Sequence, residues 1–306
     1  MSVTSTIRQP VAVLEGRDRP ALTAWLLLAP CVLYLLAFSI YPLVYSLRLS
    51  FTDLTAATGT GSFVGLANYR ALLADPMFWN AAMNSALMVT AAVALQVVLG
   101  VALALFFDLD LKGAWIVRGI LLLPMMITPI VVGVMWRALL NPDWGLVDWS
   151  IRAIGLEPPD WLGSVNMAMV TLILVDCWQW TPFVFIIVFA RLQALPRDMF
   201  EAADVDGAGP IVKFRRIILP MLMPAIVFAA VFRAVDAFRS FDLIYGLSYG
   251  GPARGTTTLA FFSFQNGFQF QNYGYAAAVA YSMLIIVIIG TTVLLRYLQL
   301  RPGQPR

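Results

Sequence analysis

Long stretches without a single charged residue are the most restrictive feature of this sequence. Residues 24–47 and 80–107 contain no Asp, Glu, Lys or Arg, and the stretch 255–295 contains none either. A helix of about 20 apolar residues crosses the roughly 30 Å hydrocarbon core of a bilayer. Hydrophobic residues make up 60% of the chain and charged residues 12%, which is outside the range of soluble domains. The chain is therefore predicted to be an all-α membrane protein.

Six membrane spans can be placed along the 306 residues. The predicted boundaries are 24–47, 80–107, 116–140, 166–191, 217–247 and 275–297. Prolines inside the third and fourth spans predict bends, because each proline frees a backbone carbonyl. The first apolar run is longer than the core of a signal peptide, so it is predicted to be an uncleaved span. We expect one helix bundle over 24–299, flanked by an N-terminal segment, 1–23, and a C-terminal tail, 300–306.

The distribution of Lys and Arg predicts the orientation of this bundle. The two termini and the second and fourth loops contain 13 of the 20 basic residues, the alternate loops contain five, and two lie in the fifth span. Because cytoplasmic loops are enriched in Lys and Arg, both termini are predicted to lie in the cytoplasm. The same spread over the loops argues against a phosphate-binding patch for nucleic acid, despite the net charge of +3.

Several kinds of chemistry lack their usual residues in this chain. The sequence contains no histidine, and its two cysteines lie in apolar runs, so neither histidine catalysis nor a transition-metal site is predicted. No G-x-x-x-x-G-K-[ST] phosphate loop is present. Nor does the sequence repeat three spans as a second set of three, the pattern of many secondary transporters. We expect the energy source, and the other half of any pore, to come from partner chains.

A polar stretch, residues 201–220, separates the fourth and fifth spans and reads EAADVDGAGPIVKFRRIILP. Proline and an acidic residue just before it favour a short helix that ends near residue 205. Gly207 and Gly209 allow backbone angles that side chains exclude, and Pro210 can open a second helix. The prediction is two short helices with a bend, in which Glu201 offers a carboxylate to a basic partner and the alanines after it leave one face shallow.

This stretch resembles the docking loop of permease subunits in binding-protein-dependent ABC importers. The family pattern is Glu-Ala-Ala, three residues, Gly, nine residues and Ile-x-Leu-Pro, and all seven defined positions are matched by Glu201, Ala202, Ala203, Gly207, Ile217, Leu219 and Pro220. The resemblance implies that the loop 192–220 docks on an ATP-hydrolysing subunit and transmits its closure. The implied coupling residues are Glu201, Ala202, Ala203, Asp206 and Gly207. The alternative is an ordinary solvated loop between two spans.

Shorter stretches resemble the sugar-type permeases of that family. They are 63–69 (F-x-G-L-x-N-Y), 178–183 (W-x-x-x-P-F), 241–245 (F-D-x-I-Y) and 248–252 (S-Y-G-G-P). The resemblance as a whole covers most of 24–299 and implies the six-helix bundle of the type I importer permeases. The connector between the first two spans is shorter than in the larger maltose permease, which supports the sugar class rather than maltose itself.

The resemblance also implies how such a chain works and with what. An extracytoplasmic binding protein or lipoprotein delivers a carbohydrate, and two six-span permease subunits form the path across a bacterial cell membrane. Two ATP-binding subunits hold ATP and Mg and drive alternating access from the cytoplasm. On this interpretation the chain is a transport subunit, not an enzyme, and binds no cofactor or metal itself. The predicted cytoplasmic position of the loop 192–220 agrees with this arrangement.

Four charged residues recur every three positions in the second half of the fifth span. Arg233, Asp236, Arg239 and Asp242 alternate in sign, so each is predicted to neighbour the next on one helix. Charges at this depth are costly unless they pair or face water. Either part of this ladder lines the solute path or its outer gate, or the ladder neutralises itself and only stiffens the span.

A second polar group interrupts the fourth span at Asp176, Trp178 and Gln179. Aromatic faces beside amides and carboxylates suit carbohydrate, which presents apolar C–H faces ringed by hydroxyl groups. The alternative is a helix that packs through tryptophan, with Asp176 paired to a basic group. Residues 261–273 mix aromatics with Gln and Asn, which fits either a solute-facing surface or an interfacial aromatic belt.

Two other classes of function remain to be compared with the importer. An ion-coupled secondary transporter would use Asp176 and the charged ladder as proton or sodium sites and would need no ATPase. A membrane enzyme acting on lipid would use Asp176 or Asp242 as acid or base, but no histidine, metal cluster or nucleophile-base pair supports it. Among importer solutes, a phosphorylated one would favour exposed basic residues, for which only Arg233 and Arg239 are candidates.

Overall fold

The computed structural model describes residues 20–109, 112–196 and 198–299 of the chain. Helices account for the regular structure of these ranges, together with two isolated backbone bridges, Thr52 with Phe63 and Thr55 with Asn272. The predicted tail 300–306 and most of the predicted segment 1–23 lie outside the described residues. The chain divides into two compact units, residues 1–48 and 49–306, which are described separately.

The first unit contains nearly all of the first membrane span, which ends at Ser50, two residues into the second unit. Helix α1 (Pro20–Leu35) continues through a π-helical turn (Leu36–Ile40) into α2 (Tyr41–Ser50). The apolar part, Leu27–Ser50, is long enough to cross a bilayer, so the predicted first span is confirmed.

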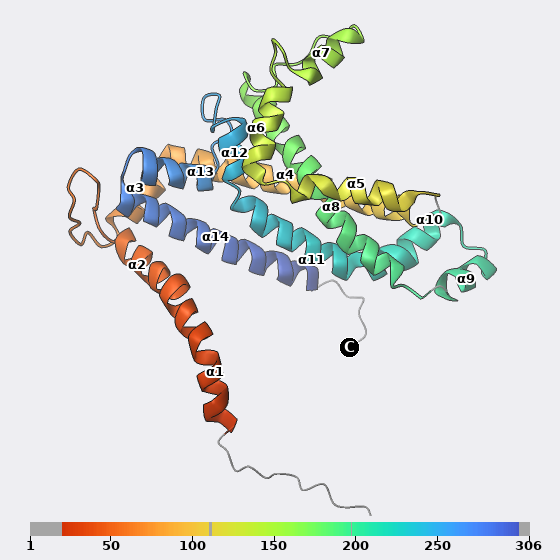
Figure 1. Cartoon of the computed structure of the whole chain (residues 1–306), viewed down its shortest axis with the longest axis horizontal. Helices are drawn as coiled ribbons and strands as arrows, with labels where there is room; N and C mark the ends of the chain where they lie inside the picture. Colours follow the sequence, from red (N-terminus) through yellow and green to blue (C-terminus); the bar gives the residue numbers. More distant parts are fainter. Residues whose placement is uncertain (1–19, 110–111, 197, 300–306) are drawn as a thin grey trace, which may run out of the picture. The chain divides into compact units, whose positions relative to one another are not determined.

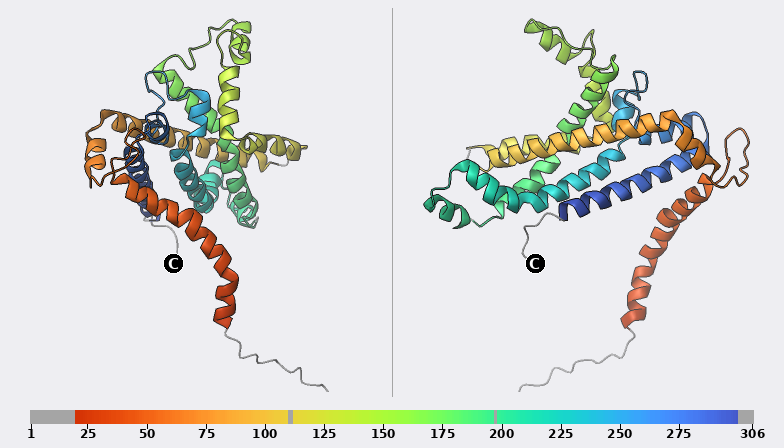
Figure 2. Two further views of the ribbon diagram at one scale, coloured as in Figure 1. Left: turned by 60° about the vertical axis from the view of Figure 1, so that its left-hand side comes forward. Right: turned by 180° about the vertical axis from the view of Figure 1, so that it is seen from behind.

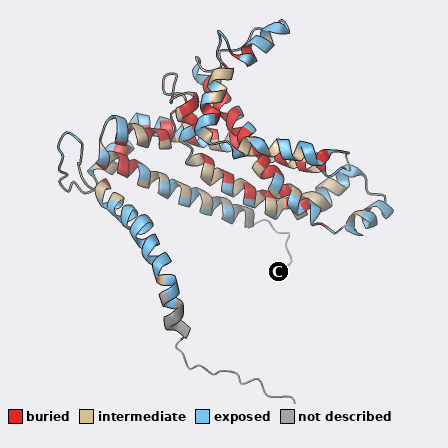
Figure 3. Ribbon diagram, in the orientation of Figure 1, coloured by how far each residue is buried: buried red, intermediate tan, exposed pale blue. Residues whose placement is uncertain are grey.

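Four long helices form the body of the second unit. These are α4 (Pro76–Phe107), α8 (Val165–Gln193), α11 (Leu219–Phe238) and α14 (Tyr273–Gln299). Helix α4 packs along both α8 and α11, and α11 also packs along α14 (Figures 1 and 2). Buried residues concentrate where α4, α8, α11 and α12 face one another (Figure 3). The second, fourth and sixth predicted spans are therefore confirmed as helices.

Helix α4 begins earlier than the apolar run alone predicted. Asp75 is its N-cap, with an extended backbone and a side chain that accepts a hydrogen bond from the Met77 N–H at 2.8 Å. Pro76 occupies the first helical position, where its missing N–H costs nothing. The cap therefore places the start of the helix four residues before Asn80.

The predicted third span is broken at its prolines. Helices α5 (Ala114–Met126) and α6 (Pro129–Leu139) meet at an angle of 100°. Ile127 and Thr128 are extended between them, and Pro129 favours this conformation because its ring excludes a helical residue before it. The described residues thus contain five helices that could each cross a membrane, or six if this bent pair counts as one.

The prediction of a single fifth span over 217–247 is wrong. Helix α11 ends at Phe238, and a separate short helix, α12 (Asp242–Leu247), follows after a break. Helix α12 packs on α6 through two glycines: a Cβ atom at Gly133 would lie 2.8 Å from the Leu243 carbonyl oxygen, and one at Gly246 would lie 2.7 Å from that of Ile130. The segment 242–247 therefore packs on α6 as a separate helix and does not continue α11.

The connector after the first span contains structure that composition did not predict. Helix α3 (Ala67–Ala74) lies within it, and the Asn68 amide donates to the carbonyl oxygens of Ser50 and Thr52 at 2.9 and 2.8 Å. Gly65 precedes the helix with a φ of +58°, a conformation that favours glycine. The F-x-G-L-x-N-Y residues therefore fold the connector back on its own start.

Candidate functional site

The loop 192–220 forms the two short helices that the sequence predicted. Helix α9 (Asp198–Val205) ends in a Schellman turn: the Gly207 N–H donates to the Asp204 carbonyl at 3.0 Å and the Ala208 N–H donates to the Ala203 carbonyl at 2.9 Å. Gly207 has a φ of +73°. Helix α10 (Pro210–Lys213) begins at the predicted proline.

The predicted need for glycine at position 209 is wrong. Gly209 has a φ of −66° and a ψ of 163°, an extended conformation that any residue can adopt. Of the two glycines in the bend, only Gly207 is required by its backbone angles. The turn bonds of the Schellman motif already reverse the chain before residue 209 is reached.

The outer surface of α9 remains available to a partner. Glu201, Ala202 and Asp206 are exposed, and Ala203 is buried. Asp204 forms an ion pair with Lys213, which joins α9 to α10. No ion pair or hydrogen bond joins the Glu201 side chain to another described residue. In the second unit α9 lies at the end opposite α3 (Figure 1).

Polar contacts fasten the base of this loop to the membrane helices. Arg191 at the end of α8 donates to the Met221 carbonyl at 3.3 Å, and Gln193 donates to Asp108 after α4 at 2.6 Å. Arg118 on α5 donates to the Phe107 carbonyl at 2.6 Å, and its guanidinium lies 4.5 Å from the centre of the Phe189 ring. Arg191 and Arg118 satisfy backbone carbonyl groups at or near helix ends, and Gln193 pairs with a carboxylate. These contacts tie the end of α8 to α4 and α11.

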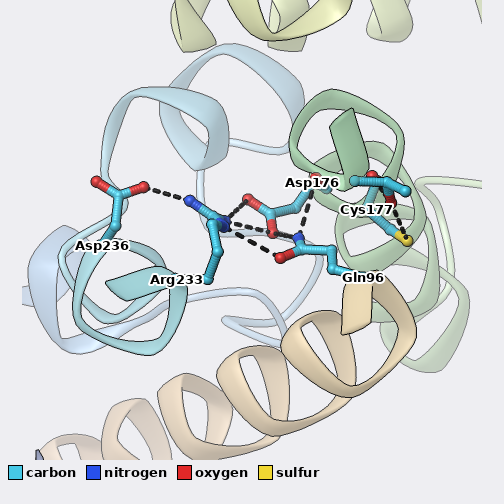
Figure 4. Close-up of polar contacts among 6 residues, drawn as sticks. Gln96, Asp176, Cys177, Arg233 and Asp236 are labelled. Atoms are coloured by element: carbon cyan, nitrogen blue, oxygen red, sulfur yellow. Dashed lines mark hydrogen bonds and ion pairs between the residues drawn. The ribbon is translucent and has the colours of Figure 1, made fainter. Parts of the chain in front are cut away.

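A buried polar cluster joins α4, α8 and α11 in the middle of the bundle (Figure 4). Arg233 Nη2 lies 3.1 Å from Asp176 Oδ2, and Arg233 Nε donates to Gln96 Oε1 at 3.0 Å. Gln96 Nε2 in turn donates to Asp176 Oδ2 at 2.7 Å. The exposed fractions of Arg233, Asp176 and Gln96 are 0%, 1% and 0%.

Arg233 has further partners on its own helix and on α8. Its Nη1 forms an ion pair with Asp236, whose side chain is 47% exposed. Its guanidinium also lies 4.5 Å from the centre of the Trp180 ring, within the range of a cation-π contact. A buried guanidinium is tolerated only with such partners, because an unpaired charge inside the membrane is costly.

The structure brings some predicted site residues together and separates others. Asp176, Arg233 and Asp236 form one cluster, and Asp176 has the basic partner that the packing interpretation required. Gln96 and Trp180 belong to the same cluster but were not predicted. A glutamine in the middle of the uncharged run 80–107 was the available signal for Gln96, because an amide there needs a buried partner.

The predicted ladder of neighbouring charges is wrong beyond Asp236. Helix α11 ends at Phe238, so Arg239 caps one helix while Asp242 starts the next. Both are exposed. Among the residues that the structure describes, neither forms an ion pair.

Trp178 and Gln179 face the elbow between α5 and α6 instead of the buried cluster. Gln179 is fully buried and donates to the Ile127 carbonyl at 2.8 Å, which satisfies a group left free by the break in the third span. The Trp178 ring contacts that of Trp136, with 5.4 Å between centres. In the stretch 261–273, Phe261 and Phe262 are buried in the core, whereas Phe268 and Phe270 are exposed.

One face of α11 borders an open cavity of about 450 Å³. Residues spaced three or four apart share a helix face, and the cavity is lined on this face by Phe228, Phe232, Asp236 and Arg239. Phe232 is stacked on Phe183 of α8, with 5.0 Å between ring centres. Aromatic rings and charged groups therefore lie along one wall of this cavity, together with Val231 and Val235, and Leu295 of α14 lines it as well.

Several known proteins with similar sequences are described as permease proteins. Residues 96–302 match the family described as "Binding-protein-dependent transport system inner membrane component". The chain is 36% identical over 292 residues to a probable ABC transporter permease protein of Sinorhizobium fredii, covering 94% of each chain. It is 32% identical to the trehalose/maltose transport system permease protein of Thermococcus litoralis, covering 91% of this chain and 94% of that protein.

The fold matches that of a solved importer. A chain in the crystal structure of a bacterial ABC transporter involved in the import of the acidic polysaccharide alginate superposes with a TM-score of 0.82. The match covers 93% of this chain and 97% of the other at 20% sequence identity. With the family match over 96–302, the chain belongs to the inner membrane components of binding-protein-dependent transport systems, the permease subunits of ABC transporters.

Proposed function

We propose that this chain forms half of the path by which an ABC importer moves a carbohydrate across the cell membrane. The observation that carries the proposal is the docking loop, with Glu201 free on an exposed helix and a Schellman turn at Gly207. The carbohydrate class is supported by the Thermococcus litoralis relative, named for trehalose and maltose, and by the structural neighbour that imports alginate.

The partners follow from what the chain lacks and what it exposes. The sequence has no phosphate loop, so ATP and Mg are bound by two ATP-binding subunits that dock on α9. A second six-span permease, most simply a related but different chain, supplies the other half of the path. An extracytoplasmic binding protein or lipoprotein delivers the solute. The predicted cytoplasmic position of both termini and α9 belongs to this proposal.

Transmission begins at α9 and proceeds through the contacts at its base. When the ATP-binding subunits close, α9 moves, and the contacts of Arg191 and Gln193 pass the motion to α11 and α4. The cluster around Arg233 keeps α4, α8 and α11 together during that motion. The cavity beside α11 then opens first to one side of the membrane and then to the other, which is alternating access.

The candidate path residues take different roles in this proposal. Asp236 and Arg239 stand on the cavity wall beside Phe228 and Phe232 and contact the solute. Asp176 is buried behind Arg233 and acts as a positioning residue. Trp178, Gln179 and Asp242 belong to the outer part, where α6 and α12 meet the bundle. The fold and the relatives lend no support to the ion-coupled or lipid-enzyme alternatives.

The test is uptake by the complete transporter under two kinds of energy depletion. Depleting ATP is expected to abolish uptake, whereas an uncoupler added at constant ATP is expected to leave it unchanged. The variant Asp236→Asn is expected to lower uptake while the subunits remain assembled. Uptake that survives ATP depletion and collapses with the uncoupler would overturn the proposal in favour of an ion-coupled carrier.

A further inference from the structure

The two arginines of α11 differ sharply in what surrounds them. Arg233 is fully buried and has Asp176, Asp236 and Gln96 as partners. Arg239 is exposed, and no ion pair or side-chain hydrogen bond joins its guanidinium to a described residue. The nearest acid along its own helix, Asp236, already has a counterion in Arg233. Arg239 is therefore the cation of this helix that has no counterion among the described residues.

The surroundings of Arg239 restrict what that partner can be. The open cavity of about 450 Å³ has Arg239 and Asp236 on the same wall as Phe228 and Phe232. Aromatic rings stack on the C–H faces of sugars, and a carboxylate accepts hydrogen bonds from hydroxyl groups. The planar guanidinium fork matches a carboxylate, phosphate or sulfonate group with two parallel hydrogen bonds. A neutral sugar would leave this fork without a counterion.

The ion pair between Arg233 and Asp236 makes an anion acceptable at this wall. An unpaired Asp236 would repel an acidic solute, but Arg233 Nη1 contacts its Oδ2 atom and neutralises it. Asp176, the remaining acid of the cluster, is buried on the far side of Arg233. Two charged side chains face the cavity. Asp236 is neutralised by Arg233, whereas Arg239 has no counterion among the described residues.

We propose that the solute is an acidic carbohydrate, whose anionic group pairs with Arg239 while its sugar ring stacks on Phe232 or Phe228. This inference rests on the proposed function and adds the charge of the solute to it. Arg239 is a specificity residue: it selects acidic over neutral sugars of equal size. Asp236, held by Arg233, contributes hydroxyl recognition on the same wall.

The experiment uses the complete transporter in proteoliposomes, supplied with ATP and with an equal mixture of cellobiose and cellobiouronic acid, which differ by one carboxylate. Accumulation of each is read by mass spectrometry. The acidic sugar is expected to predominate in the wild type. Arg239→Gln is expected to lower its accumulation at least tenfold and to abolish the preference for it over the neutral sugar, and Arg239→Lys to restore part of that preference. Arg70→Gln, which changes an exposed arginine on α3, is the matched control and is expected to have no effect.

Each other outcome contradicts a distinct statement. If the wild type prefers cellobiose and Arg239→Gln leaves that preference unchanged, the proposal of an acidic solute is wrong, but the proposed carbohydrate import is not contradicted. Loss of the second permease subunit from purified Arg239→Gln would also overturn it, because Arg239 would then pair with an acid of that subunit. Accumulation of neither sugar would instead contradict the carbohydrate function on which the inference depends.

Discussion

Arg233 joins three membrane helices through its side chain alone. Its guanidinium has partners on α4, α8 and α11. Arg233 and its partners Gln96 and Asp176 are buried. A buried ion pair of this kind contributes little net stability compared with apolar residues, but breaking it leaves an uncompensated charge. The removal of one partner should therefore cost far more than the removal of both charges.

Arg233→Met is the variant that tests this asymmetry. It leaves Asp176 charged and buried without its cation, which is expected to cost about 3–5 kcal/mol of stability. The double variant Asp176→Asn/Arg233→Met should recover most of that loss. Thermal unfolding of the purified protein in detergent measures both. Equal destabilisation by the single and double variants would show that the charge balance does not matter.

Gly207 and Gly209 form a natural pair for a second test at this scale. Gly207 has a φ of +73° and Gly209 a φ of −66°, and a Cβ atom added at either would meet nothing within 4 Å. Gly207→Ala is expected to strain the turn by about 1–2 kcal/mol and weaken docking of the ATP-binding subunit about tenfold. Gly209→Ala is expected to bind it normally. Equal binding by the two variants would contradict the role assigned to the Schellman turn.

The sequence predicted the role of a single residue where that role depends only on the local backbone conformation. The need for glycine at 207 and the helix start at Pro210 follow from allowed dihedral angles. The partners of Arg233 could not be predicted, because Gln96, Asp176 and Arg233 come together only through the packing of three helices. The spacing of three residues between charges predicted that they would be neighbours on one helix. Arg239 does not follow this prediction, because α11 ends at Phe238.

At the scale of helices, α6 and α12 pack directly on one another through two glycines. Gly133 and Gly246 bring the two backbones together, and a break in the chain precedes each helix, after Met126 and after Phe238. Apolar length alone could not predict either break, because residues 116–140 and 217–247 are each long enough for one straight span. The prolines indicated the first break, and nothing in the composition around Ser240 indicated the second.

Gly133→Ala tests this contact. The added Cβ would lie 2.8 Å from the Leu243 carbonyl oxygen and from the Leu247 nitrogen, so α6 and α12 must separate. The expected loss of stability is about 1–3 kcal/mol, the usual cost of overpacking. Gly119→Ala in α5, where a Cβ meets nothing within 4 Å, is the control and should be neutral or slightly stabilising. Thermal unfolding that did not distinguish the two variants would contradict the packing described.

At the scale of the whole molecule, the sequence predicted the class and the family, because apolar length and the docking motif are properties of the chain itself. The six predicted spans agree with the described helices only if the bent pair α5 and α6 counts as one span. Orientation rests on the uneven distribution of Lys and Arg. It is tested by single cysteines in a Cys31→Ala/Cys177→Ala background, at exposed Ala57 in the connector that is predicted to be external and at exposed Val205 in α9. A membrane-impermeant thiol reagent on intact cells should label Ala57→Cys, and Val205→Cys only after lysis. The reverse pattern would invert the topology.

The most direct test of the permease assignment is the composition of the complex that this chain forms. The chain is extracted gently from its native membrane as wild type, Glu201→Lys and the control Glu157→Lys, whose glutamate is exposed in the loop after α7 (Leu146–Ala153). Mass spectrometry then identifies what is purified with it. An ATP-binding subunit and a second six-span chain are expected with the wild type and the control, and Glu201→Lys is expected to lose the ATP-binding subunit. Recovery of the wild-type chain alone, even after cross-linking, would contradict the assignment and leave the docking loop without a partner.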